Sequence, residues 1–167
     1  MHYKGFIIGA LVVAALAGIM WWGAQQKNGG NATTPEEKSN GLLVSVERIF
    51  DFGSISMAAG NVKHTFAVKN TGSEAVRIRK MYTSCMCTSA ILTIGSGKRY
   101  GPFGMPGHGF IPSINTEVRS GEEINVEVIF DPAAHGPAGI GEIERLVALE
   151  HNAGESLELN IRAVVTP

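Results

Sequence analysis

Two cysteines separated by one residue form the part of this sequence that is best suited to chemistry. Cys85 and Cys87 lie within residues 83–88 (TSCMCT), and they are the 2 cysteines of the chain. In an extended strand, residues i and i+2 face the same side with Cα atoms about 6.6 Å apart, the upper limit for a disulfide. A disulfide would therefore need a kink, whereas a metal with two bonds of about 2.3 Å accepts sulfurs up to about 4.6 Å apart.

Three interpretations of this pair follow from its chemistry. The thiols are buried apolar side chains or a structural disulfide, which is the commonest role of cysteine. Alternatively, they bind a soft metal such as Cu(I), because thiolate and thioether ligands favour that ion. Thiol redox chemistry is the third, although redox motifs normally use Cys-x-x-Cys at a helix N-terminus. The candidate metal ligands are Cys85, Cys87, Met86, Met81, Met105 and His108.

Two further histidines are assigned structural roles. His135 lies in the segment Ala-His-Gly-Pro, where we expect it to cap a turn between strands. His64 shares its strand parity with Phe66 and Val68, so we expect it to pack at the margin of the core.

The sequence contains no signature of an enzyme. It has no serine nucleophile elbow, no zinc-protease helix motif and no evident pair of acid and base carboxylates. With 14 basic and 15 acidic residues, it also lacks the positive excess of a nucleic-acid binder. We therefore expect neither catalysis nor a nucleic-acid partner.

The N-terminal residues 1–24 have the character of a membrane anchor. Residues 5–22 are uncharged and predominantly apolar, and as a helix they would span roughly 27 Å, close to the thickness of a bilayer core. A cleaved signal peptide is the alternative, but the small-residue cleavage pattern is poor here. The distribution of lysines favours a cytoplasmic N-terminus, which predicts a single-pass protein with its folded domain outside the cytoplasm. Residues 25–40 have the composition of a flexible linker.

From residue 41 to 167 the pattern predicts short β-strands. Alternating apolar and polar residues occur at 42–50, 62–69, 75–81, 89–94, 123–130, 143–150 and 157–165. Turn residues separate these segments, and no convincing amphipathic helix lies among them. About seven strands of this kind predict an immunoglobulin-like antiparallel β-sandwich.

Residues 95–112 predict a long irregular loop, since they contain six glycines and three prolines. Lys98, Arg99, Tyr100, Phe103 and Phe110 give this loop the aromatic and basic content of a contact surface. The loop is therefore the candidate partner-binding site. The alternative is an insertion that packs over its own sandwich.

Several short motifs occur in a fixed order along residues 50–136. They are FDFG at 50–53 with Ile55, Gly60, Phe66, KNTG at 69–72, SC-x-CT at 84–88, SGE at 120–122, and VIFDP at 128–132 with Gly136. In this order they resemble a bacterial domain-of-unknown-function family of exported Ig-like proteins. That family is similar in turn to Hydin-like and major-sperm-protein-like sandwich domains. The resemblance implies a sandwich in the bacterial envelope. Met86 replaces the glycine usual in the family's Ser-Cys-Gly-Cys-Thr motif, so a tight-turn geometry is not carried over.

Together these features predict a single-pass protein of the bacterial inner membrane. Its Ig-like domain is expected to be a non-catalytic binding or assembly module with an envelope protein partner. The alternative function is binding of Cu(I) by the Cys-x-Cys pair, and no other cofactor is expected.

Overall fold

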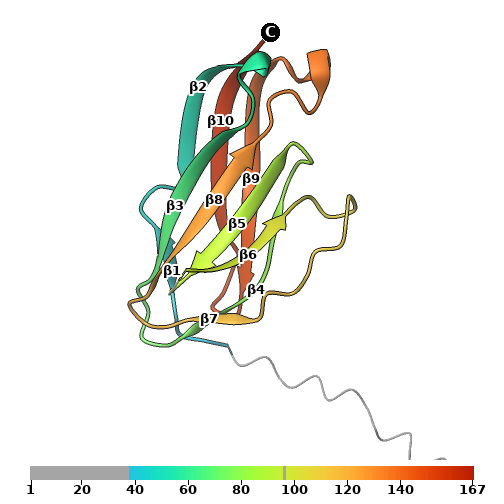
Figure 1. The fold of residues 1–167 in the computed structure, drawn as a ribbon. Coiled ribbons are helices and arrows are strands. Elements are labelled where there is room, and N and C mark those ends of the chain that lie inside the picture. The colour runs from blue at the N-terminus through green and yellow to red at the C-terminus, as the bar shows by residue number, and fades with distance from the viewer. Residues whose placement is uncertain (1–37, 96) are drawn as a thin grey trace, which may run out of the picture. The chain divides into compact units, whose positions relative to one another are not determined.

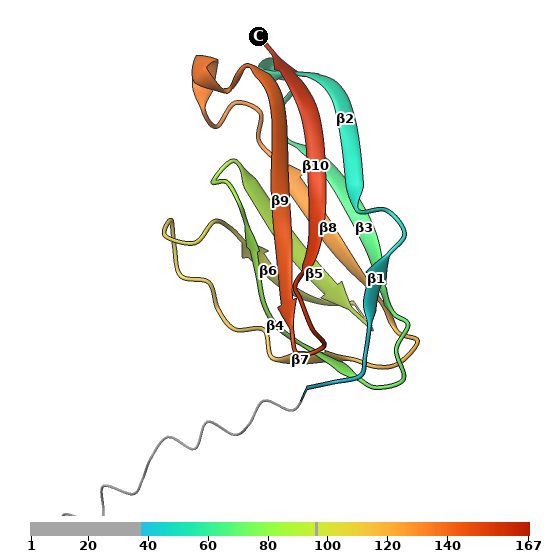
Figure 2. The same cartoon turned by 180° about the vertical axis from the view of Figure 1, so that it is seen from behind.

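The protein forms two five-stranded β-sheets. The computed structural model describes residues 38–95 and 97–167. The first sheet has the order β1 (Leu43–Ser45), β3 (Val62–Asn70), β8 (Glu123–Phe130), β5 (Thr88–Ile94) and β6 (Lys98–Phe103). The second has the order β2 (Ile49–Ser56), β10 (Leu157–Thr166), β9 (Gly141–His151), β4 (Val76–Thr83) and β7 (Thr116–Val118). Figures 1 and 2 show the two sheets from opposite sides.

The core lies between the sheets, on the apolar face that the alternating pattern predicts. Burial alternates strictly along β5, and it alternates along most of β8 and β10. Phe66, Leu92, Ile124, Leu149 and Leu159 are among its fully buried side chains. The β-sandwich is therefore confirmed, and the expected strands at 62–69, 89–94 and 123–130 occur within one residue of their predicted bounds.

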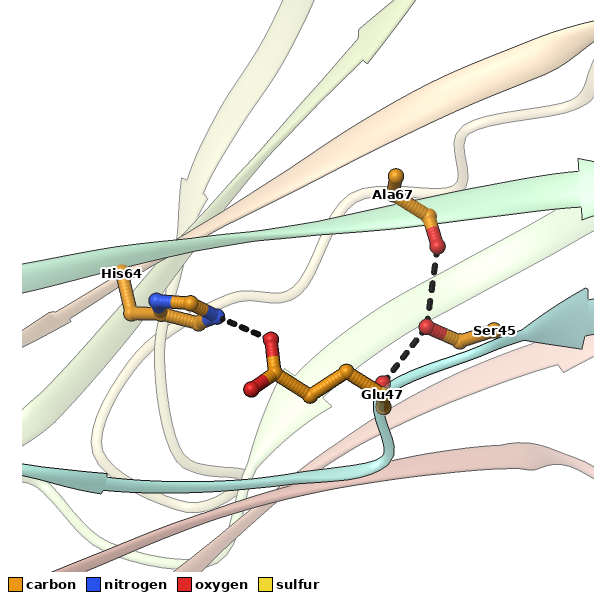
Figure 3. A network of polar contacts seen from close by, with 4 residues as sticks. All are labelled: Ser45, Glu47, His64 and Ala67. Atoms are coloured by element: carbon orange, nitrogen blue, oxygen red, sulfur yellow. Dashed lines mark hydrogen bonds and ion pairs between the residues drawn. The ribbon is translucent and has the colours of Figure 1, made fainter.

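The prediction of about seven antiparallel strands is wrong in number and in one pairing. The described residues form ten strands, and β2 pairs with β10 in parallel. The segment predicted as one strand at 42–50 is divided between β1 and β2, which belong to different sheets. The division lies at Ser45, whose hydroxyl oxygen is 2.6 Å from the Glu47 carbonyl oxygen and 2.9 Å from that of Ala67, so its proton can be donated to either. Figure 3 shows the chain leaving β1 at this point.

The passage of the chain from β1 to β2 also explains the position of His64. Its ring stacks on Phe50 with centroids 3.6 Å apart, and its Nε2 lies 2.8 Å from a carboxylate oxygen of Glu47 (Figure 3). Phe66 meets the other side of the ring edge-on at 4.7 Å. His64 thus packs at the core margin, as its strand parity predicts.

Residues 95–112 are not entirely irregular, which corrects the prediction. β6 forms inside this segment and pairs with β5 along the edge of the first sheet. Pro102 is compatible with β6 because an edge strand has one side whose N–H groups need no partner in the sheet. The segment that follows β6 has no regular structure until β7 begins at Thr116.

The predicted anchor or signal peptide at 1–24 and most of the linker at 25–40 lie outside the described residues. Within 38–95 and 97–167, no helix is sufficiently long and apolar to cross a membrane. The last linker residues belong to the folded domain. The Ser39 N–H donates to the Asn152 carbonyl at 3.1 Å, and the Asn40 N–H donates to the Glu74 carboxylate at 2.8 Å.

Candidate functional site

The cysteine pair lies in the turn between β4 and β5, so it crosses from one sheet to the other. The Thr88 N–H donates to the Cys85 carbonyl at 3.2 Å and closes the turn. The buried Thr83 hydroxyl lies 3.0 Å from the carbonyl oxygens of both Cys85 and Thr88. The Cys87 N–H donates to Cys85 Sγ at 3.4 Å. The pair is therefore held in a kinked conformation, and the extended geometry assumed from the sequence does not apply.

Ser84 fixes this turn to the second sheet. Its N–H donates to the Leu146 carbonyl, and its Oγ accepts the Leu146 N–H, both at 2.9 Å. The turn therefore lies against the middle of β9, beside Arg145.

The connection between β8 and β9 brings His135 to the cysteines. The Asp131 N–H donates to the Cys87 carbonyl at 2.9 Å, and the Asp131 carboxylate accepts the Ala133 N–H at 2.9 Å. The chain then turns into the short 3₁₀ helix η2 (Gly136–Gly139). Figures 1 and 2 show this connection and the β4–β5 turn at the same end of the sandwich.

His135 Nε2 lies 3.1 Å from Cys85 Sγ. His135 occupies the N-cap position of η2, between two strands as predicted, but its side chain makes no capping bond there. A Cβ at Gly139 would lie 3.1 Å from the His135 Cβ, so the glycine allows the loop to fold closely around the histidine. The pairing of β5 with β8 brings the two residues together: Thr88 lies opposite Phe130, which places the segments adjoining both residues at one end of these strands.

Cys85, Cys87 and His135 together form a compact group of donor atoms. One ligand atom from each residue lies within 4.8 Å of the other two. Cys87 is 3% exposed and belongs to the core, Cys85 is partly buried, and His135 is exposed. Both cysteines are free thiols. The group is thus closed on the core side and accessible from solvent on the histidine side.

The two thiols have different proton affinities. Burial raises the pKa of Cys85, but hydrogen bonds from the Cys87 thiol, the Cys87 N–H and His135, with the charge of Arg145, outweigh it and lower the pKa to about 7. Burial and the bond to Cys85 raise the pKa of Cys87. At neutral pH the pair therefore retains a proton on Cys87 while Cys85 is substantially a thiolate.

Arg145 provides the positive charge at this site. From β9, its Nε donates to Cys87 Sγ at 3.2 Å, and its Nη1 donates to the Glu144 carbonyl at 2.9 Å. The guanidinium is partly buried and held at two points. Arg145 is not predicted from the sequence, because the alternation of apolar and polar residues along a strand does not indicate which turn a side chain contacts.

The other predicted metal ligands are one buried methionine, one exposed methionine and two residues of the connection after β6. Met81 is fully buried in β4, and Met86 is 56% exposed at the tip of the turn. Met105 and His108 lie in the connection after β6, where the His108 N–H donates to the Met105 carbonyl at 3.3 Å. His108 is not a member of the group formed by the cysteines and His135.

The predicted partner-binding residues are only partly available. Lys98 and Arg99 are exposed on β6, and Lys98 Nζ lies 5.0 Å from the Tyr100 ring centroid. Phe103 is 3% exposed and lies in the core, so its prediction as a contact residue is wrong. Phe110, in contrast, is 90% exposed. It borders a hollow of about 450 Å³ whose lining also includes Tyr82 and Ile111.

Comparisons with known proteins match one segment of the chain to a family model. A family model described as "Protein of unknown function (DUF1573)" matches residues 43–97, which include the two cysteines but neither His135 nor Arg145. A search of curated protein sequences finds no match.

Solved structures provide similar folds at low sequence identity. A protein of unknown function from Porphyromonas gingivalis W83 has a TM-score of 0.56 at 14% identity, over 80% of this chain and 51% of that one. The present chain thus spans about half of that protein. The ASH/PapD-like domain 7 of human CEP192 has a TM-score of 0.45 at 12% identity, over 80% and 89% of the two chains. The CooA pilin subunit of enterotoxigenic Escherichia coli has a TM-score of 0.42 at 10% identity, over 77% and 100%.

Proposed function

We propose that this domain binds a soft metal ion, Cu(I), through Cys85, Cys87 and His135. The observation that supports this function is the approach of two thiol sulfurs and an imidazole nitrogen from two separate loops to within 4.8 Å of one another. Thiolates select soft ions such as Cu(I), and imidazole is also a suitable copper ligand. The sequence predicts a binding or assembly module and gives Cu(I) binding only as the alternative, and its predicted ligands do not include His135.

The spacing of the donors requires only a small adjustment for an ion to bind. Metal bonds of about 2.3 Å to sulfur and about 2.0 Å to nitrogen place S and N roughly 3.8 Å apart in a trigonal site. Cys85 Sγ and His135 Nε2 are now in direct contact at 3.1 Å. Because His135 lies in an exposed loop, its ring can move outward by this amount while the buried Cys87 stays fixed.

The state of the thiols also supports binding. A purely structural cysteine is buried and protonated, which describes Cys87 but not Cys85. The lowered pKa of Cys85, about 7, provides a thiolate at neutral pH without a helix N-terminus. Little free energy is therefore needed to deprotonate Cys85 before it forms a bond to the metal.

An anaerobic titration with a Cu(I) chelator as competitor tests this function on the full chain in detergent. The reduced protein should bind one Cu(I), and the Cys85→Ser/Cys87→Ser double variant should bind none while keeping its β-sheet circular dichroism. Absence of binding by the wild type, or equal binding by the double variant, would refute the proposal.

A second candidate function is the docking of a protein partner at Phe110. An aromatic side chain that is 90% exposed beside a hollow is unusual for a soluble surface and typical of a contact residue. Phe110→Ser should abolish co-purification of an envelope partner. Ile140→Ser is the control, since Ile140 is also an exposed apolar residue. It is 46% exposed and forms the C-cap of η2. Equal recovery of every partner with both variants would refute this candidate.

We also propose that residues 1–24 anchor the chain so that the domain lies outside the cytoplasm. This proposal rests on the sequence argument alone. A membrane-impermeant maleimide tests this directly, because Cys85 is accessible. Labelling of Cys85 in intact spheroplasts is expected. Labelling only after lysis would place the domain in the cytoplasm and refute the proposed orientation.

A further inference from the structure

Arg145 is the cationic group that contacts the donor set. Its Nε lies 3.2 Å from Cys87 Sγ, and its second bond, to the Glu144 carbonyl, holds the guanidinium in place. The neighbouring carboxylates do not cancel this charge. Glu144 pairs with Arg162 at 3.2 Å, and Asp131 lies outside the group of donor atoms and accepts the Ala133 N–H.

The total charge of the occupied site depends on the ion. Two thiolates and a neutral imidazole carry a charge of −2. A monovalent ion leaves −1, which Arg145 neutralises, whereas a divalent ion leaves 0, so the site with Arg145 carries +1. Because Cys87 and much of Arg145 are withdrawn from water, an uncompensated charge is more costly here than in solvent.

We infer that Arg145, through its bond to Cys87, makes the site selective for monovalent Cu(I) over divalent ions such as Zn(II). This inference depends on the proposed function, since it concerns the same three ligands. Arg145 is a positioning residue that holds charge beside the metal and is not itself a ligand. Zn(II) is the relevant competitor because two cysteines, one histidine and a water molecule would otherwise suit it.

The test compares Cu(I) and Zn(II) affinities of the full chain by anaerobic competition at one pH and ionic strength. In Arg145→Gln, the ratio of Cu(I) to Zn(II) affinity should fall by roughly tenfold or more, as expected for the loss of one unit charge at this distance. Arg145→Lys retains the charge and should keep most of the wild-type ratio. An unchanged ratio in Arg145→Gln would overturn the inference.

A second pair of variants tests the charge without changing the buried contact. Met86 is 56% exposed between the cysteines, so Met86→Lys and Met86→Gln both leave the core intact. Met86→Lys should raise the preference for Cu(I) relative to Met86→Gln, and an equal preference in the two would contradict the inference. If the wild type binds no Cu(I) at all, the proposed function itself fails. If the wild type binds Cu(I) but the ratio of Cu(I) to Zn(II) affinity does not change in the charge variants, only the inference about Arg145 fails.

Discussion

His135 Nε2 and Cys85 Sγ lie 3.1 Å apart, although 50 positions separate the two residues in the sequence. The pairing of β5 with β8 brings them together, since Thr88 and Phe130 face each other where the β4–β5 turn enters one strand and the β8–β9 connection leaves the other. The bond from the Asp131 N–H to the Cys87 carbonyl then fixes the two segments at their base. The proximity of the three residues of the proposed site thus follows from sheet register.

Removing the imidazole should weaken metal binding selectively. His135→Ala should lower Cu(I) affinity by at least tenfold, because even groups that only orient ligands contribute 10–100-fold at metal sites. His108→Ala is the matched control, since His108 is an exposed loop histidine outside the donor group. Anaerobic competition titration measures both. Equal losses for the two variants would mean that His135 is not a ligand.

In the metal-free reduced protein, the alkylation rate of Cys85 should rise with pH through a midpoint of about 7. Burial raises its pKa, but hydrogen bonds from Cys87 and His135 outweigh this and lower it, and the reactive thiolate predominates above the pKa. Cys87 should react more slowly, as it is buried and its pKa is raised. Peptide mass spectrometry after iodoacetamide pulses resolves the two sites.

His135→Ala also affects this titration. Loss of its hydrogen bond should move the Cys85 midpoint to higher pH, while His108→Ala should leave it in place. A wild-type midpoint near 9, the ordinary value for the thiol, would disprove the assigned hydrogen-bond network.

His151 should make the protein less stable in mild acid. Its side chain is 8% exposed, and burial, with the charge of Arg79, lowers its pKa below the ordinary 6.5. The unfolded chain therefore takes up a proton first, so the stabilisation is complete above pH 6.5 and is lost as the pH falls towards the lower folded value. The loss is at most about 1.4 kcal/mol for each pH unit in that window.

Urea unfolding at pH 7.5 and pH 5.5 measures this contribution. His151→Asn retains an acceptor for the Ala153 N–H, which His151 Nδ1 now accepts at 3.1 Å. The decrease in unfolding free energy between the two pH values should be smaller in this variant than in the wild type. The same decrease in both would show that His151 is not responsible.

The strands that alternate cleanly are the part of the fold that the sequence predicts well. Residues 123–130 form β8 with the predicted bounds, because every second side chain enters the core. The failures have local causes. β1 ends at Ser45, whose hydroxyl bonds to the Glu47 carbonyl, and β2 then enters the other sheet. β6 forms despite Pro102 because it lies at a sheet edge. Neither the break after Ser45 nor the position of β6 at a sheet edge alters the alternation of apolar and polar residues, so the sequence pattern does not reveal them.

The site was predictable only in part, for a similar reason. Cys85 and Cys87 are separated by a single residue, so the sequence alone indicates that they could act together. His135 and Arg145 reach them from β8–β9 and β9 through strand register, which composition and periodicity do not specify. The KNTG motif at 69–72 shows the same limit: the sequence contains the motif, but it does not reveal that the Asn70 side chain is buried and bonds several backbone groups.

Asn70 should be the most destabilising polar position to replace. It is fully buried, and its amide donates to the carbonyls of Glu74 at 2.7 Å and Val118 at 2.9 Å. Its Oδ1 accepts the N–H groups of Leu42 and Gly72, both at 3.1 Å. One side chain thus satisfies four backbone groups and joins β3 in the first sheet to β7 in the second.

Asn70→Ala leaves these four groups without that partner, and each buried group left unsatisfied costs about 1–3 kcal/mol unless water reaches it. We expect the unfolding free energy to fall by about 3 kcal/mol, measured by urea denaturation with an unchanged m-value. Asn125→Ala is the matched control, because Asn125 is exposed on β8, and its loss should stay within about 0.5 kcal/mol. Asn70→Asp retains both acceptor bonds but turns a carboxylate towards two carbonyls, so it too should be destabilising, and more so at pH 7 than at pH 4. A loss for Asn70→Ala no larger than that for Asn125→Ala would show that the two sheets do not depend on this side chain.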